Sequence, residues 1–367
     1  MPAVLLLRRD AIDGLRWGAG LLGWLATMGA SAVIFHGTDD PTHNTTPPEG
    51  EWADSGWQWQ GDWRGFVGTP IAPHWFLTAK HIGGKVGDVF RFAGEAWPVT
   101  AFFDDTASDL RLAQVCGELP AFAPLYEGAD EVGQTAIFFG RGLSRGSIVT
   151  VTNATEEVEM RGWRWKSSTS ALRWGLNQIV DTVPYDTEPG TLLRATFDPA
   201  GGVDEATWAG GDSGGGMFLQ REGRWELAGV AYGVDGPFRY TAEGNELNAA
   251  LFDTRGFYER GGFGWMLIPA SGPPRPASLY ASRISARRQW ILSTMEQHPA
   301  PEVFPKVWRA TSAEGTYQEE TAIVDVGRQE IRVSLPAGPA FFKLSACRYL
   351  RITGVVAEEA ELVLRYE

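Results

Sequence analysis

Residues 211–215 read Gly-Asp-Ser-Gly-Gly, and this pentapeptide is the most informative stretch of the chain. A serine between glycines can stand exposed on a tight turn, because glycine tolerates the backbone angles and close approach that the turn needs. Backbone N–H groups left free at such a turn can hold a developing oxyanion. The segment therefore predicts a nucleophile at Ser213, against the plainer interpretation of a Gly- and Ser-rich surface turn.

A serine hydroxyl is a weak nucleophile until a base takes its proton, so the next residue to look for is a histidine. The chain contains five histidines: His36, His43, His74, His81 and His298. His81 follows the hydrophobic run 75–79 and precedes Gly83-Gly84. It would therefore lie at the end of a buried strand, at the start of a loop that can reach a cleft. This position predicts that His81 is the base, with an ordinary core or surface histidine as the alternative.

The base needs a buried carboxylate that holds its tautomer and stabilises the imidazolium. Asp109 opens the alternating segment 109–115, whereas Asp104 and Asp105 lie in a more polar stretch. We therefore predict that Asp109 is the acid partner, with a solvated surface carboxylate as the alternative for all three.

Composition narrows the class of protein. The chain has 367 residues, 44% of them hydrophobic and 21% charged, which is typical of a soluble protein with a sizeable core. A formal charge of −13 repels phosphate backbones, so we expect no nucleic-acid partner. The two cysteines, Cys116 and Cys347, form neither a zinc spacing nor a disulfide framework. We expect no cofactor, no metal and no bridge between cysteines so far apart in sequence.

The first 32 residues resemble a targeting segment. Arginines at positions 8, 9 and 16 precede the uncharged run 18–28, and Ala30-Ser31-Ala32 provides small residues for a signal peptidase. Export would make the mature protein secreted or periplasmic. A membrane anchor is the competing interpretation, because an uncharged run of about 18 residues is just long enough to span a bilayer. A buried N-terminal helix is the plainer alternative.

The rest of the chain divides into two regions. Residues 33–298 contain short apolar runs separated by Gly, Asp, Asn and Pro turns, which indicates an all-β domain. A helix is expected from about Tyr280 to Gln297. Prolines 299, 301 and 305 then mark a boundary, and the alternating residues of 299–367 predict a small β domain.

Five segments together resemble the chymotrypsin/trypsin-type serine proteases. Residues 211–215 are identical to the nucleophile motif of that family, and the order His, Asp, Ser along the chain is also the family's order. The other four resemble its histidine, aspartate, N-terminal and C-terminal helix segments: Thr78-Ala79-Lys80-His81, Asp109-Leu110-Arg111-Leu112, Ile34-Phe35-His36-Gly37 and Tyr280-Ala281-Ser282-Arg283-Ile284-Ser285 with Trp290-Ile291.

The resemblance implies a double six-stranded β barrel with the site between the barrels, a C-terminal helix and, after it, a small β-sandwich-like domain. It implies a secreted serine endopeptidase with an oxyanion hole at Gly211 and Ser213. Residues Ala231-Tyr232-Gly233 resemble the segment that pairs with the substrate backbone. Asp212 would pair with a freed N-terminal amine, which is Val33 if signal peptidase cuts after Ala32, one residue before the family's expected Ile34.

The sequence departs from the family pattern at several positions. Thr207 stands where trypsins have an acid in the substrate pocket, so we expect cleavage after small or apolar residues rather than Arg or Lys. Lys80 replaces an alanine. The insertion 153–189 and the long segment 233–260 have no counterpart that can be aligned.

The expected partners are protein or peptide substrates, with a monomeric enzyme and contact with a membrane only if the leader is retained. Two other functions use the same residues. One is a catalytically silent relative that binds peptides, and the other is an esterase with the same triad, because the triad itself does not encode the substrate.

Overall fold

The structure is a computed structural model that describes residues 33–153, 155–167, 171–186, 188–261, 264–300, 305–347, 350–358 and 360–367. The predicted export segment, residues 1–32, lies outside the described residues. The chain divides into two compact units, one within residues 29–301 and one that includes residues 302–367. Among the helices that the structure describes, none is both long and apolar enough to cross a lipid bilayer.

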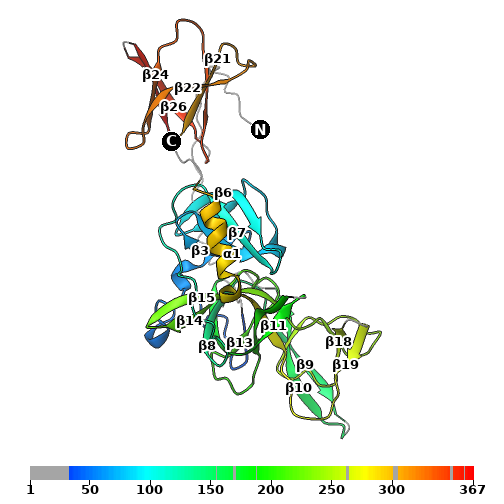
Figure 1. Cartoon of the computed structure of the whole chain (residues 1–367). Helices are drawn as coiled ribbons and strands as arrows, with labels where there is room; N and C mark the ends of the chain where they lie inside the picture. The colour runs from blue at the N-terminus through cyan, green and yellow to red at the C-terminus, as the bar shows by residue number, and fades with distance from the viewer. Residues whose placement is uncertain are drawn as a thin grey trace, which may run out of the picture. The chain divides into compact units, whose positions relative to one another are not determined.

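Six antiparallel strands close the first barrel in the order β2-β3-β4-β7-β6-β5 (Figure 1). Their bounds are β2 Gly61–Trp63, β3 Phe66–Ala72, β4 Trp75–Ala79, β5 Val89–Phe92, β6 Glu95–Asp104 and β7 Leu110–Val115. Alternation along β5 turns Phe90 and Phe92 inward and leaves their neighbours exposed. Phe90 stacks on Phe76 at 4.1 Å between ring centroids, and Trp63 closes the same core.

A second barrel follows, closed in the order β11-β12-β20-β15-β14-β8. Its strands are β8 Thr135–Gly140, β11 Arg173–Tyr185, β12 Glu188–Thr196, β14 Gly216–Arg221, β15 Arg224–Val234 and β20 Ser278–Arg283. Phe138, Leu193, Met217 and Leu279 fill its interior from four different strands. Two such barrels with little helix are the trypsin-like fold, so the predicted fold class is confirmed.

The C-terminal helix α1 spans Ile284–Gln297, four residues shorter at its start than predicted. Residues 280–283 belong instead to β20, which pairs with β12 on one side and β15 on the other. Hydrogen bonds to two neighbouring strands override the local helical propensity of these residues. Ile284 and Ile291, seven residues apart on one helix face, pack into a core shared with Trp75 and Leu112 of the first barrel.

Short strands extend the second barrel. β1 (Ile34–Phe35) pairs with β13 (Ala206–Thr207). A lobe consists of the sheets β17-β10-β9 and β16-β18-β19, which Figure 1 shows projecting from the barrel. Its strands are β9 Ser144–Thr152, β10 Val158–Lys166, β16 Phe238–Arg239, β17 Ala249–Leu251, β18 Tyr258–Gly261 and β19 Gly264–Leu267. The unaligned segment 153–189 therefore contains one lobe strand, β10, one barrel strand, β11, and the first two residues of the barrel strand β12.

The C-terminal unit consists of two sheets, ordered β22-β21-β25 and β23-β24-β27-β26. The bounds are β21 Lys306–Ala310, β22 Gln318–Glu320, β23 Ala322–Asp325, β24 Glu330–Ser334, β25 Phe341–Ser345, β26 Ile352–Glu358 and β27 Glu361–Tyr366. Val307 from one sheet and Ile331, Val333 and Leu364 from the other share one core. This is the expected sandwich-like arrangement.

Cys116 and Cys347 are disulfide-bonded, so the expectation of no bridge was wrong. Cys116 directly follows β7, and Cys347 follows β25. The separation of two cysteines along a chain does not determine their separation in the folded protein. Bridge geometry depends on the positions of Cα and Cβ in space, which sequence spacing does not provide.

Candidate active site

Three side chains that the sequence singled out lie in one hydrogen-bonded row. The Nδ1 atom of His81 lies 2.5 Å from a carboxylate oxygen of Asp109, and its Nε2 atom lies 2.7 Å from the Ser213 hydroxyl. The backbone N–H of His81 donates to the other Asp109 oxygen at 3.2 Å. The His81 side chain is 42% exposed and that of Asp109 only 4%, so the row runs from the interior to the surface.

Two adjacent strands, β4 and β7, position His81 and Asp109. β4 ends at Ala79, which pairs with Leu110 at the start of β7. The chain then turns through a short 3-10 helix, Lys80–Ile82, and this turn carries His81. Asp109 precedes β7 directly, and the N–H of Lys80 donates to its carbonyl at 2.6 Å. His81 and Asp109 therefore lie at the same end of the β4–β7 pair, and their side chains meet although the two residues are far apart in sequence.

The turn that carries Ser213 needs its glycines. Gly211 and Gly214 have φ angles of +95° and +79°, where a side chain is strained, and a Cβ on Gly214 would lie 2.1 Å from the Val67 carbonyl oxygen. Within the described part of the chain, the N–H groups of Gly211 and Ser213 donate to no protein acceptor. Both groups are thus free to donate to an oxyanion beside the Ser213 hydroxyl.

Asp212 points away from the site into the protein. Its carboxylate is fully buried and accepts N–H bonds from Ala209 at 2.7 Å and Gly142 at 2.6 Å, and from Val33 and Arg141. Burial raises the pKa of this carboxyl from 3.8 to about 7, although the hydrogen bonds from these N–H groups act in the opposite direction. The sequence predicted Val33 as the terminus that cleavage after Ala32 would create, one residue before the family's expected Ile34, and the Val33 N–H lies at this carboxylate.

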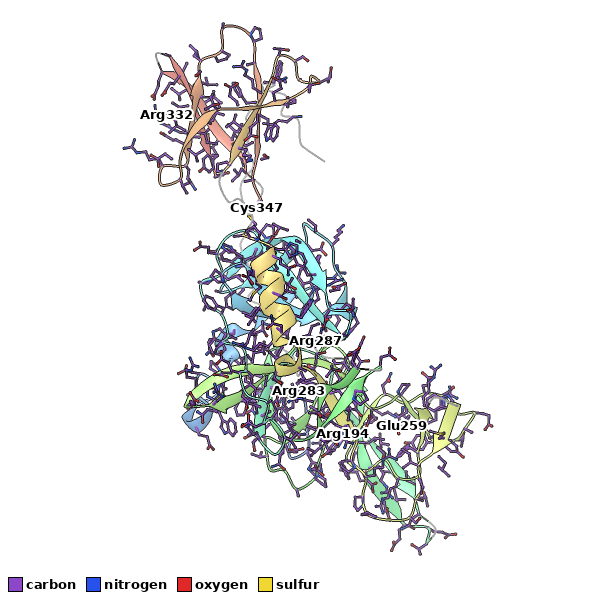
Figure 2. The ribbon with its side chains drawn as sticks, viewed as in Figure 1. Arg194, Glu259, Arg283, Arg287, Arg332 and Cys347 are labelled. Carbon is purple, nitrogen blue, oxygen red and sulfur yellow. The ribbon has the colours of Figure 1, made fainter. Side chains whose placement is uncertain are left out.

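A positively charged side chain beside His81 supports the turn that leads to Asp109. The Lys80 ammonium donates to the carbonyls of Asp105 and Ser108, at 2.9 and 2.8 Å. Arg287 of α1, labelled in Figure 2, makes two hydrogen bonds of 2.6 Å to the buried Asp105 carboxylate. Although burial opposes ionisation, the hydrogen bonds from Arg287 and Ser108 lower the pKa of Asp105. The sequence flagged Lys80 as an unusual cation but did not assign it these partners.

Of the four predicted substrate-contacting residues, two lie near the end of β15 and the other two are buried inside the protein. Tyr232 and Gly233 are half-buried near the end of β15, and the Tyr232 ring lies 6.3 Å from the His81 ring, edge to face. Ala231 is buried in the second barrel core. Thr207 is buried in β13, where it pairs with Ile34. Its neighbours Ala206 and Trp208 pack in the same core cluster as Ala231.

A pocket beside this row was not predicted. It has a volume of about 330 Å³ and is lined by seven residues from four strands and by Asp186 of the turn after β11: Val183, Pro184, Tyr185, Asp186, Leu192, Arg194, Tyr232 and Tyr280. Only Tyr232 among them was singled out from the sequence as a substrate contact.

The described residues contain no cluster of three or more His, Cys, Asp or Glu side chains that could hold a metal ion. No known protein-family model matches the chain. The site therefore has to be interpreted from its own geometry.

Proposed function

We propose that this protein is a serine endopeptidase with Ser213 as nucleophile, His81 as general base and acid, and Asp109 as the residue that orients His81. The observation that carries the proposal is the hydrogen-bonded row from Asp109 through His81 to Ser213, beside two unpartnered N–H groups. A nucleophile, a base and an orienting group within hydrogen-bond reach of one another are the requirements for acyl transfer.

The first half of the reaction forms an acyl-enzyme. The Ser213 oxygen attacks the carbonyl carbon of the scissile bond while His81 Nε2 takes the hydroxyl proton. The negative charge that develops on the carbonyl oxygen is held by the N–H groups of Gly211 and Ser213. His81 then gives its proton to the leaving amine, and the C–N bond breaks. Asp109 stays ionised and stabilises the imidazolium formed in between.

The second half returns the enzyme to its starting state. Water replaces the amine, His81 takes a proton from it, and the hydroxide oxygen attacks the acyl carbon. The proton then passes to the Ser213 oxygen as the ester bond breaks, which releases a carboxylic acid product. Thr207, which is uncharged, leads us to expect cleavage after small or apolar residues.

We further propose that cleavage after Ala32 activates the enzyme. The new Val33 amine would stand where the Val33 N–H now donates to Asp212, and it would add a positive charge beside a buried carboxylate. Asp212 lies between the two oxyanion-hole residues. An ion pair at this point would therefore hold the Gly211–Ser213 backbone in place.

The test compares the full chain and the form that begins at Val33 with their Ser213→Ala variants, using fluorescent casein and a short-chain ester as substrates. We expect casein cleavage and covalent labelling by a serine-directed inhibitor, and loss of both in Ser213→Ala. Ser147→Ala, at an exposed serine in β9, is the matched control and should keep both. Ester hydrolysis without casein cleavage would favour an esterase. A folded protein that neither cleaves nor labels would favour a silent binding protein.

A further inference from the structure

The second half of β9, residues 148–152, is a free strand edge of the lobe. β9 is the outermost strand of the sheet β17-β10-β9. Near its start, the Arg145 side chain donates to the carbonyls of Phe35 and His36, which ties that end of the strand to the barrel. In the described part of the chain, residues 148–152 make backbone hydrogen bonds to β10 alone. Alternate N–H and C=O groups of this stretch therefore point outward from the sheet.

The side chains on one face of this edge are exposed and uncharged. Ile148, Val158 and Met160 have exposed fractions of 59%, 68% and 40%. The register pairs Val158 with Thr152 and Met160 with Thr150, so these four residues share a face. Alternation along β9 places Ile148 on the same face as the two threonines. Contiguous exposed apolar surface of this kind marks a contact site on a soluble protein.

The edge lacks the features that usually prevent a further strand from adding. Natural proteins protect a free edge with charged residues, proline or a bulge. Residues 146–152 read Gly-Ser-Ile-Val-Thr-Val-Thr, with neither a charge nor a proline. Each of residues 148–152 has a partner in β10, and the one extra residue opposite them, Arg161, lies on β10. The stretch is therefore regular and open to another β-strand.

The distribution of charge favours a second copy of this chain as the partner. The formal charge of −13 makes two copies repel each other over most of their surface. The lobe is an exception, because residues 142–166 and 236–267 contain seven Lys or Arg and seven Asp or Glu. Two copies can therefore meet at the lobe without a net repulsion. The exposed face described above has no Lys or Arg that would favour an anionic lipid surface instead.

The edge is also complementary to itself. A twofold axis perpendicular to the sheet brings two copies of β9 together as antiparallel neighbours, with residues of the same face opposite each other. A register centred on Thr150 uses the whole free stretch, since Thr150 then faces its own copy and Ile148 faces Thr152. Pairs of β-branched side chains stabilise antiparallel strands. The lobe projects from the barrel (Figure 1), which leaves this edge accessible to a second molecule.

We propose that two copies of this chain associate through β9, so that their two three-stranded sheets join into one. This dimer replaces the monomer that the sequence led us to expect, and it does not depend on the proposed catalytic activity. Because the free stretch is short, the contact is small and the association is reversible, with a dissociation constant of roughly 1–100 µM.

The test is sedimentation of the Ser213→Ala protein, which prevents self-cleavage, both as the full chain and as the form that begins at Val33. We expect the average mass to rise from that of a monomer to that of a dimer between about 1 and 200 µM. Thr150→Lys places two ammonium groups opposite each other and should weaken the association about tenfold or more. Val86→Lys, at an exposed valine before β5, is the matched control and should leave it unchanged.

A cross-link tests the register independently of the lysine variant. Thr150→Cys would place two thiols opposite each other, where Cα atoms of paired strands are about 4.5–5.5 Å apart and a disulfide can form. Cys116 and Cys347 are already disulfide-bonded, so they do not compete. We expect a covalent dimer of Thr150→Cys on a non-reducing gel, and none of Val86→Cys.

Three results would overturn the dimer: a monomer at every concentration, an equal effect of the two lysine variants, or no cross-link from Thr150→Cys. A monomer whose binding to casein or to anionic vesicles is weakened by Thr150→Lys would assign the edge to a polypeptide or to a lipid surface instead.

Discussion

Acetylation of the Val33 amine should destabilise the processed protein in a pH-dependent way. Burial raises the pKa of the Asp212 carboxyl from 3.8 to about 7, despite its hydrogen bonds from N–H groups, which corresponds to a cost of about 4 kcal/mol once it is ionised. Because the folded-state pKa lies above the unfolded value, this cost is absent below about pH 4 and grows as the pH rises to about 7. A Val33 ammonium would lower the pKa of Asp212 and remove the cost.

The assay uses Ser213→Ala protein that begins at Val33, to prevent self-cleavage, with the amine free or acetylated. Urea unfolding followed by tryptophan fluorescence gives the free energy of unfolding of each form at pH 4.5 and pH 7. We expect the free form to be more stable by up to about 4 kcal/mol at pH 7, and by about 1 kcal/mol at pH 4.5. Asp212→Asn is the control and should remove the pH dependence of the difference. Equal stabilities at both pH values would refute the proposed pairing of Val33 with Asp212.

Three further predictions concern the site and its support. Asp109→Asn should lower kcat by about 10⁴-fold with the fold retained, because His81 would lose its orienting carboxylate; steady-state kinetics and circular dichroism test this together. Lys80→Met removes two hydrogen bonds to the turn before Asp109 and should lower kcat/KM by about tenfold. Lys85→Met, at an exposed lysine, is the control and should leave kcat/KM unchanged. An equal effect of both variants would exclude a positioning role for Lys80. Burial raises the pKa of Glu205 from 4.5 to about 8, so the free energy of unfolding should fall as the pH rises between these two values. Glu205→Gln should flatten this pH dependence, as measured by urea unfolding. An unchanged dependence would show that Glu205 is not its source.

The sequence singled out the three side chains of the hydrogen-bonded row through local patterns. Each of His81, Asp109 and Ser213 is marked by its own short segment, because a buried strand end or a glycine turn is encoded by neighbouring residues. The structure places their side chains within hydrogen-bond distance of one another. The all-β class could likewise be expected from the short apolar runs between turns, whereas the two barrels were implied only by the resemblance to the chymotrypsin/trypsin-type proteases.

Local helical propensity gave a wrong prediction for residues whose secondary structure depends on pairing with distant strands. Residues 280–283 have helical neighbours in sequence, yet they form the central strand between β12 and β15. The same pairing, with its register shift, turns Tyr232 towards His81. Neither feature is encoded within the segment itself.

By itself, the sequence determined the all-β class, because the short apolar runs and the turns between them depend on residues close together in the chain. Only the tertiary structure decided that Cys116 and Cys347 are bonded, and that residues from four strands and one turn line a pocket beside His81. These features depend on which distant segments pair and in what register. Burial, hydrogen bonding and packing over the whole molecule set that register, and no single segment contains it.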